Sequence, residues 1–262
     1  MVSPKPGRPL AKAIADIAFG IWFGCVFTVA SLCCVMIIAI LPGLARRKHV
    51  VAGFARSVFI LTGSLPRVAN LGELPDGPMV VVANHASYLD GVLLTAVLPA
   101  RFSFVIKSEM SRVPLAGFLL RRIDSFFVDR GGSGGRSARQ TRQIITAAKQ
   151  GRALGFFPEG TFRNEAGLLK FYSGAFAAAA AGDLPLVPCA ITGTRAMLSA
   201  DARLPRIAPL TVTLLPKLEI DATAAHPVRD LRDRARAAIL AACAEPDAID
   251  VTLPAPGAPA QR

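Results

Sequence analysis

A polar cluster interrupts an apolar run at residues 79–94, and its side chains are of the types that transfer protons. His85 supplies an imidazole, and Asp90 follows it five residues later. An imidazole, whose ordinary pKa is about 6.5, accepts a proton near neutral pH, and a carboxylate that holds one ring nitrogen leaves the other free to do so. The pair therefore indicates a general base with an orienting partner.

The neighbouring residues predict the elements that would position this pair. Residues 79–83 are Val-rich and follow a turn-like Pro-Asp-Gly-Pro, which predicts a buried strand, and residues 88–98 predict a helix with Ser87 as its N-cap. His85 would then follow a strand end, where α/β proteins place their chemistry. The alternative is structural, because Ser87 and Asp90 also fit a capping box, in which Asp90 only satisfies N–H groups at the helix start.

Two later stretches carry further patterns. Pro158-Glu159-Gly160-Thr161 follows the strand-like residues 153–157, and residues 184–191 predict another strand that contains Pro188. Glycine at 160 allows the backbone to approach a ligand closely. Taken alone, the four residues would be interpreted as a surface turn with a solvated glutamate. Their place directly after a buried strand favours a functional role.

Together these stretches resemble the glycerolipid acyltransferases, the family that includes 1-acylglycerol-3-phosphate O-acyltransferase. The family hallmark N-H-x-x-x-x-D is matched by Asn84, His85 and Asp90, and the P-E-G-T block by residues 158–161. The basic-ended strand of the family is matched by residues 127–130 and its late V-P block by residues 187–188. The resemblance covers roughly residues 68–246, with the four blocks in the family's order.

The resemblance implies an O-acyltransferase without a cofactor or metal. His85 would remove a proton from the hydroxyl of a lysophospholipid, above all 1-acylglycerol-3-phosphate, and Asp90 would orient it. The hydroxyl would attack an acyl thioester, either acyl-CoA or an acyl carrier protein, which would then be a protein partner. Residues expected to bind substrates, from their motif or their place at a strand end, are Asn84, Ser87, Lys107, Arg130, Glu159, Gly160, Thr161, Arg163 and Pro188.

One position departs from the family pattern. Phe162 follows Thr161 where many members have arginine, and Arg163 stands one place later and could substitute. Another lysolipid acceptor is therefore the alternative to lysophosphatidate, with acyl transfer unchanged.

The composition restricts the partners. A formal net charge of +12 predicts affinity for an anionic partner, and the absence of zinc spacing or RNA-binding aromatic motifs favours a phospholipid surface over nucleic acid. None of the five cysteines forms a C-x-x-C pair, which fits a reducing cytosol.

Residues 17–45 carry no charge, which predicts a membrane anchor that either spans the bilayer or returns near Pro42 and Gly43. The alternative, a secretory signal peptide, usually has a shorter apolar core. With the family resemblance, this segment predicts a membrane protein, expected in a bacterial inner membrane with its catalytic domain on the cytoplasmic side.

Strands alternate with helices over the remainder, which predicts an α/β fold in which a mixed sheet is flanked by helices. The expected organisation is a membrane anchor with an interfacial helix at 1–62, an acyltransferase domain at 63–246 and a disordered tail at 247–262. The N-terminal segment is expected to be membrane-embedded and helical. Apolar residues at helical spacing predict the interfacial helix at 50–62, for which an ordinary connecting helix is the alternative. Residues 66–78 are turn-rich, and residues 114–122 predict a short helix.

Two other functions compete. Gly131 to Gly135 with Ser133 match G-x-S-x-G, and His226 with Asp183 or Asp201 would complete a serine hydrolase. That reaction gives no role to His85, Asp90 or Glu159. The second is a non-catalytic protein that binds anionic lipid, and turnover of a thioester donor would distinguish it.

Overall fold

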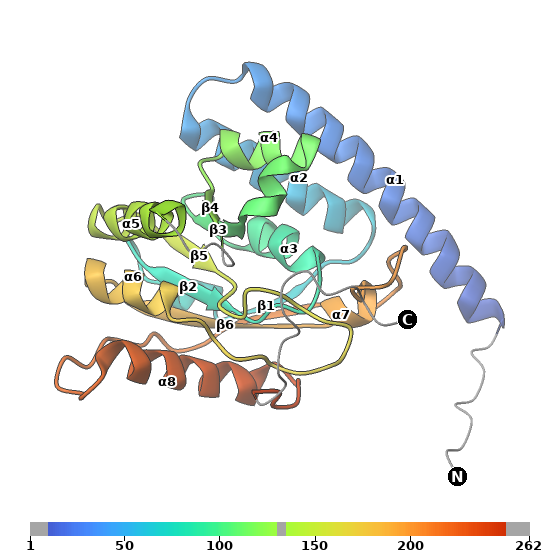
Figure 1. Ribbon diagram of the computed structural model, residues 1–262. Coiled ribbons are helices and arrows are strands. Elements are labelled where there is room, and N and C mark those ends of the chain that lie inside the picture. Colours follow the sequence, from blue (N-terminus) through green and yellow to red (C-terminus); the bar gives the residue numbers. More distant parts are fainter. Residues whose placement is uncertain (1–9, 130–134, 250–262) are drawn as a thin grey trace, which may run out of the picture.

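A seven-stranded sheet forms the centre of the computed structural model, which describes residues 10–129 and 135–249 (Figure 1). The strands are β1 (Arg67–Ala69), β2 (Val80–Ala83), β3 (Ser103–Lys107), β4 (Phe126–Val128), β5 (Leu154–Phe156), β6 (Leu186–Thr192) and β7 (Thr211–Leu214). Their order is β1-β7-β6-β2-β5-β3-β4, and every pair is parallel except β6 with β7. The predicted mixed α/β sheet is confirmed.

The parallel strands bring distant motifs to one edge. β2, β3, β4, β5 and β6 all run in the same direction, so their carboxyl ends share an edge of the sheet. His85 follows β2, Lys107 ends β3 and Glu159 follows β5. The order of the strands therefore places the H-x4-D and P-E-G-T motifs side by side.

Helices cover both faces of the sheet, which explains why β2 is buried along its whole length. One face is covered by α1 (Leu10–Ile40), α2 (Leu44–Leu61) and α3 (Leu89–Val97), with α4 (Pro114–Arg122) packed against α1 and α2. The opposite face is covered by α5 (Gly135–Lys149), α6 (Gly174–Gly182) and α8 (Pro227–Ala242). Three short helical turns complete the chain: η1 (Leu71–Glu73), η2 (Ser108–Arg112) and α7 (Thr194–Met197).

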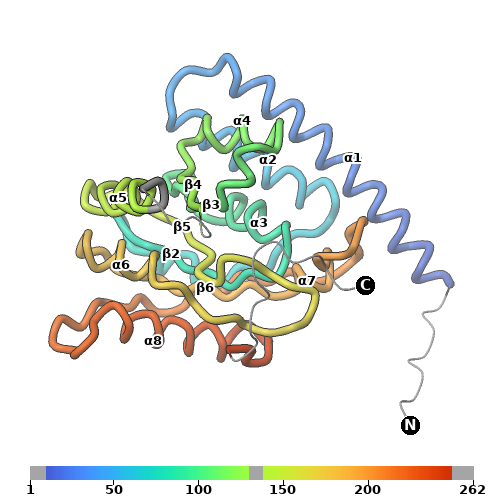
Figure 2. Tube along the Cα trace, in the orientation of Figure 1, coloured from blue at the N-terminus to red at the C-terminus, as the bar shows by residue number. Residues whose placement is uncertain are grey.

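The N-terminal apolar segment forms a helical hairpin (Figures 1 and 2). α1 ends at Ile40, and Gly43 with a positive φ of 87° makes the turn into α2, as only glycine does without strain. α1 is long and apolar enough to cross a membrane by length and composition. One stripe of it, from Asp16 to Ile38, is nevertheless buried against the rest of the protein.

Three sequence predictions need correction. The helix expected at 50–62 begins earlier, at Leu44, because the chain reverses at Gly43. β1 lies in a stretch predicted to be only turn-rich, since its three residues are too few and too exposed for an apolar pattern. The first residues of the segment expected to be a disordered tail are ordered. Asp247 forms an isolated β-bridge with Leu168, and the backbone N–H of Ala248 donates to the Leu168 carbonyl at 3.1 Å.

Candidate active site

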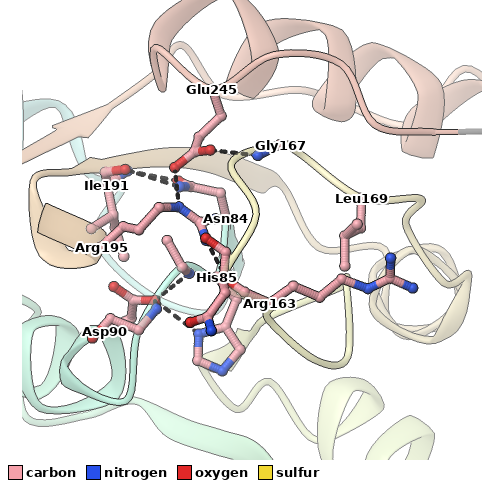
Figure 3. Close-up of polar contacts among 12 residues, drawn as sticks. Asn84, His85, Asp90, Arg163, Gly167, Leu169, Ile191, Arg195 and Glu245 are labelled. Carbon is pink, nitrogen blue, oxygen red and sulfur yellow. Dashed lines mark hydrogen bonds and ion pairs between the residues drawn. The ribbon is translucent and has the colours of Figure 1, made fainter. Parts of the chain in front are cut away.

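The turn after β2 holds His85 against Asp90. Nδ1 of His85 lies 2.8 Å from Oδ2 of Asp90, whose side chain is fully buried. The same oxygen accepts hydrogen bonds from the backbone N–H groups of Ala86 at 2.6 Å and Ser87 at 2.8 Å. Asp90 lies in the first turn of α3, so the chain between the two residues folds back over its carboxylate (Figure 3). The other ring nitrogen, Nε2, is left for a substrate.

Asp90 therefore makes the contacts that both interpretations of the sequence expect. Its bond to the N–H of Ser87 is one half of a capping box, and Oγ of Ser87 accepts from the N–H of Leu89 at 3.1 Å in return. The bond to the imidazole is additional. The helix itself begins at Leu89, one residue later than predicted, with Tyr88 as its N-cap residue.

Asn84 and Ser87 are corrected from substrate contacts to structural ones. The Asn84 side chain is 2% exposed and bonds the backbone of Ile191 twice, as donor to its carbonyl at 2.9 Å and as acceptor from its N–H at 2.7 Å. Ser87 is fully buried, and its hydroxyl donates to the Leu198 carbonyl at 2.7 Å. Both side chains fix the turn around His85, and neither is open to a substrate in this structure.

Glu159 joins the two motifs. Its carboxyl group is 1% exposed and accepts from the N–H of His85 at 2.6 Å and from the N–H of Leu169 at 2.8 Å. Burial raises the pKa of Glu159 from 4.5 to about 8, although both hydrogen bonds act in the opposite direction. Glu159 was expected to contact a substrate. Its carboxyl group instead faces the backbone of His85 and Leu169, and it holds these two segments together.

The rest of the P-E-G-T block forms a tight turn. Gly160 has a φ of 77°, and its N–H donates to the Phe157 carbonyl at 3.1 Å. Only Thr161 of the block is exposed. Thr161 and the surface of Gly160 remain available to a ligand, while Pro158 and Glu159 are buried.

Aromatic rings enclose the imidazole, a feature that sequence analysis missed. Phe157 stacks on His85 with ring centroids 4.3 Å apart, and Phe162 contacts it edge-on at 4.6 Å. Tyr88 in turn meets Phe162 at 4.7 Å. The only sequence signal was the aromatic residues beside the two motifs. These rings cover most of the imidazole and leave 18% of the His85 side chain exposed.

A clamp of distant residues holds the loop that continues from Thr161. We call residues 163–169 the clamped loop. Nε of Arg195 lies 2.9 Å from Oε1 of Glu245, and Arg195 also donates to the carbonyl of Arg163 (Figure 3). The second oxygen of Glu245 accepts from the N–H of Gly167 at 2.6 Å.

A second ion pair fastens the end of the same loop. Arg236 in α8 donates to the carbonyls of Leu168 at 2.7 Å and Leu169 at 3.1 Å, and pairs with Asp247 at 2.5 Å. Leu169 is the residue whose N–H reaches Glu159. The segment that follows α8 is therefore connected to His85 through this loop.

The predicted cations do not converge on His85. Lys107 is half exposed at the end of β3 and pairs with Glu109 at 3.1 Å. The guanidinium of Arg163 is directed away from the imidazole in Figure 3. Arg130 lies outside the described residues. Pro188 is buried in β6 between β2 and β7, so it shapes the sheet and not a substrate wall.

The hydrolase alternative finds no triad among the described residues. Ser133 lies outside them. His226 begins α8, and within residues 10–129 and 135–249 it is hydrogen-bonded to neither Asp183 nor Asp201. The same ranges contain no group of three or more His, Cys, Asp and Glu side chains that could hold a metal ion.

Comparison with known proteins shows that the sequence is similar to acyltransferases. The family model described as Acyltransferase matches residues 66–192. The chain is 36% identical over 136 residues to a lyso-ornithine lipid O-acyltransferase of Pseudomonas aeruginosa, covering 52% of this chain and 51% of that protein. It is 28% identical over 171 residues to a 1-acyl-sn-glycerol-3-phosphate acyltransferase of Saccharomyces cerevisiae, covering 63% and 56%. The chain thus spans about half the length of these relatives.

A solved structure shares the fold. The crystal structure of the 1-acyl-sn-glycerophosphate acyltransferase PlsC from Thermotoga maritima superposes with a TM-score of 0.71, over 87% of this chain and 96% of that one. The two sequences are 18% identical, so the likeness concerns the fold. It includes the mixed sheet and its flanking helices.

Proposed function

We propose that the chain is a glycerolipid acyltransferase that moves a fatty acyl group from an acyl thioester to the hydroxyl of a lysolipid. The observation that carries this proposal is the bond between Nδ1 of His85 and the buried Asp90, which fixes the ring and leaves Nε2 for a hydroxyl proton.

The chemistry follows from these two side chains. Nε2 of His85 takes the proton of the acceptor hydroxyl as its oxygen attacks the thioester carbonyl. The tetrahedral intermediate then expels the thiolate, which receives the proton back from the imidazolium. Asp90 stabilises the imidazolium between the two steps. A positioned base of this kind contributes roughly 10²- to 10⁴-fold in rate.

The hairpin of α1 and α2 supports a membrane location. α1 exposes apolar side chains along its outer side, among them Ile14, Ile21, Val29 and Met36. Its other side is bound to the domain at both ends, since Asp16 contacts the N–H of Ile207 and Arg122 donates to the Ile38 carbonyl. A helix held along its length by a water-soluble domain would lie in one leaflet, with the helix axis along the surface. We propose a bacterial inner membrane, with the domain on the cytoplasmic side, which agrees with the unpaired state of all five cysteines.

The acceptor has two candidates. The first is 1-acylglycerol-3-phosphate, which the yeast relative is named for, with acyl-CoA or acyl carrier protein as donor. The second is a lysolipid of the lyso-ornithine type, which carries no phosphate. Phe162 favours the second, because a ring and not a cation lies against His85 where a phosphate contact is expected, and the Pseudomonas relative is named for that acceptor.

An acceptor panel tests the proposal. Purified full-length protein is incubated with labelled acyl-CoA and either lysophosphatidate or lyso-ornithine lipid, with His85→Ala as the blank. Product above the blank with either acceptor is expected. No product with any lysolipid, from acyl-CoA or acyl carrier protein, would overturn the proposed function.

One substitution separates the two acceptors. Phe162→Arg introduces a guanidinium next to His85, and a charge-assisted contact with a phosphate is worth roughly 1.5–3 kcal/mol, or about one to two decades in affinity. We expect the KM for lysophosphatidate to fall by that factor. Phe162→Leu, which removes the ring without adding charge, is the control. An unchanged KM in Phe162→Arg would show that the phosphate is held elsewhere.

A further inference from the structure

The loop between α7 and β7, residues 198–210, has an exposed side that alternates basic and apolar residues. Arg203 and Arg206 are exposed, and between and beside them lie Leu204, 39% exposed, and Ile207, 63% exposed. Apolar side chains in water next to cations are typical of surfaces that enter the head-group region of a membrane. We call these residues the α7–β7 loop.

This loop is built onto the N-terminal half of α1. A Cβ on Gly20 would lie 2.7 Å from the Pro205 carbonyl oxygen and 2.8 Å from Cβ of Leu204, so glycine permits the close approach. One turn earlier, Asp16 accepts from the N–H of Ile207 at 3.4 Å. Figure 1 shows the loop, in orange, rising beside this end of α1. The loop therefore contacts α1 at Asp16 and Gly20, and the next residue of the helix in each case, Ile17 or Ile21, is exposed.

The charges beside the loop favour an anionic lipid surface. Arg203, Arg206 and the exposed Lys12 of α1 are cations at this end of the helix. The exposed Asp201 opposes them, and it accepts the Ser199 hydroxyl at 2.7 Å. Cations near an anionic bilayer contribute about 1 kcal/mol each.

We propose that the α7–β7 loop is a second membrane contact, in which Leu204 and Ile207 enter the lipid while Arg203 and Arg206 bind anionic head groups. The proposal rests on the membrane location of α1 and goes beyond it. It also links the membrane to the reaction site, since the loop begins at Leu198, whose carbonyl accepts the Ser87 hydroxyl two residues from His85. A lysolipid in the same leaflet would then meet the site beside this loop.

The single tryptophan of the chain makes the test specific. Trp22 lies on α1 and is half exposed, so the wild-type protein reports on α1 alone. Trp22→Phe combined with Ile207→Trp moves the reporter to the loop. Trp22→Phe combined with Arg229→Trp is the control, because Arg229 is 70% exposed on α8, across the sheet from α1. Each full-length protein is mixed with phosphatidylcholine–phosphatidylglycerol vesicles whose acyl chains are plain or brominated.

We expect brominated acyl chains to quench the tryptophan fluorescence of the Ile207→Trp reporter to about the extent seen for Trp22 in the wild type. The emission of this reporter should also shift to the blue on binding to vesicles. The fluorescence of the Arg229→Trp control should stay unchanged. Adding Arg203→Gln and Arg206→Gln to the loop reporter should weaken its insertion by about fivefold per residue when phosphatidylglycerol is present. Quenching at position 22 without quenching at position 207 would overturn the loop contact and keep the α1 anchor. No quenching at either position would overturn both, and insertion unaffected by the two glutamines would overturn the head-group contact.

Discussion

The two segments that meet at His85 differ in what holds them. The turn after β2, residues 84–90, has a hydrogen-bond network of its own, in which one oxygen of Asp90 bonds His85, Ala86 and Ser87, and the remote bonds of Asn84 and Ser87 add to it. The clamped loop after β5 is held by residues far along the chain. Arg195 follows β6, Arg236 lies in α8, and Glu245 follows α8.

This difference suggests that the two segments have different roles in the reaction. A turn that carries its own hydrogen bonds keeps the base in one geometry, as proton transfer requires. The clamped loop continues directly from Thr161 and Phe162, and the remote side chains that hold it fix where these two residues lie. We therefore propose that the turn supplies the chemistry and that Thr161, Phe162 and the clamped loop set the choice of acceptor. Glu159 is the joint between them.

The largest effect is expected from breaking that joint. Glu159→Ala leaves the N–H groups of His85 and Leu169 buried without acceptors, each at a cost of about 1–3 kcal/mol. We expect the free energy of unfolding to fall by roughly 2–6 kcal/mol, measured by urea denaturation. A loss below about 1 kcal/mol, the lower end of that cost for a single group, would mean that the two segments are positioned independently.

The same residue predicts a pH dependence with a definite sign. Its pKa is about 8 in the folded protein against an ordinary 4.5, so between these values the folded state keeps a proton that the unfolded chain has released. Stability contributed by Glu159 should therefore fall as the pH rises through this window. Glutamine does not titrate, so in Glu159→Gln the urea midpoint of unfolding should fall less steeply with rising pH than it does in the wild type.

The next effect concerns the turn alone. Asp90→Asn keeps an oxygen for the N–H groups of Ala86 and Ser87 but loses the charge opposite the imidazolium. Turnover should fall by roughly ten- to a hundredfold, since a hydrogen bond to a charged group is worth about 1.5–3 kcal/mol, while the Tm stays close to that of the wild type. Asp90→Ala should also lower the Tm. An active Asp90→Asn beside a destabilised Asp90→Ala would leave capping as the only function of the carboxylate.

The smallest effect is expected from the clamp. Glu245→Ala frees the N–H of Gly167 and the guanidinium of Arg195, so the clamped loop gains freedom at some distance from the base. The KM for the acceptor should rise by about tenfold, or ~1.4 kcal/mol, with little change in kcat or in the KM for the donor. Asp230→Ala, which breaks the exposed pair with Arg234 on α8, is the control. A fall in kcat without a change in KM would assign the loop to chemistry instead.

Sequence reasoning succeeded where contacts are local. His85 and Asp90 are five residues apart, and their bond depends only on a strand end followed by a helix start, both of which have clear sequence patterns. α4 was predicted with its observed bounds, because Pro114 opens it and its apolar spacing is regular. The alternation of strands and helices predicted a mixed sheet flanked by helices, whereas the order of the strands is known only from the structure.

It failed where partners are remote. Gly167 and Glu245 are 78 residues apart, and nothing local marks either as a partner of the other. Asn84 and Ser87 were expected to face substrate because they lie in the N-H-x4-D motif, whereas their partners are the backbone of Ile191 and Leu198, 107 and 111 residues away. The rings around His85 were not predicted, because Phe157 and Phe162 are far from it in the sequence. They approach His85 only when β2 and β5 pair in the sheet.

The central claim is that His85 is the base for acyl transfer, and one measurement tests it most directly. Thiol release from acyl-CoA is followed at saturating donor and acceptor for the wild type and for His85→Ala, with circular dichroism confirming that both are folded. The account predicts acceptor-dependent release in the wild type and a turnover at least about 10²-fold lower in His85→Ala. A folded His85→Ala protein that releases thiol at close to the wild-type rate would contradict it.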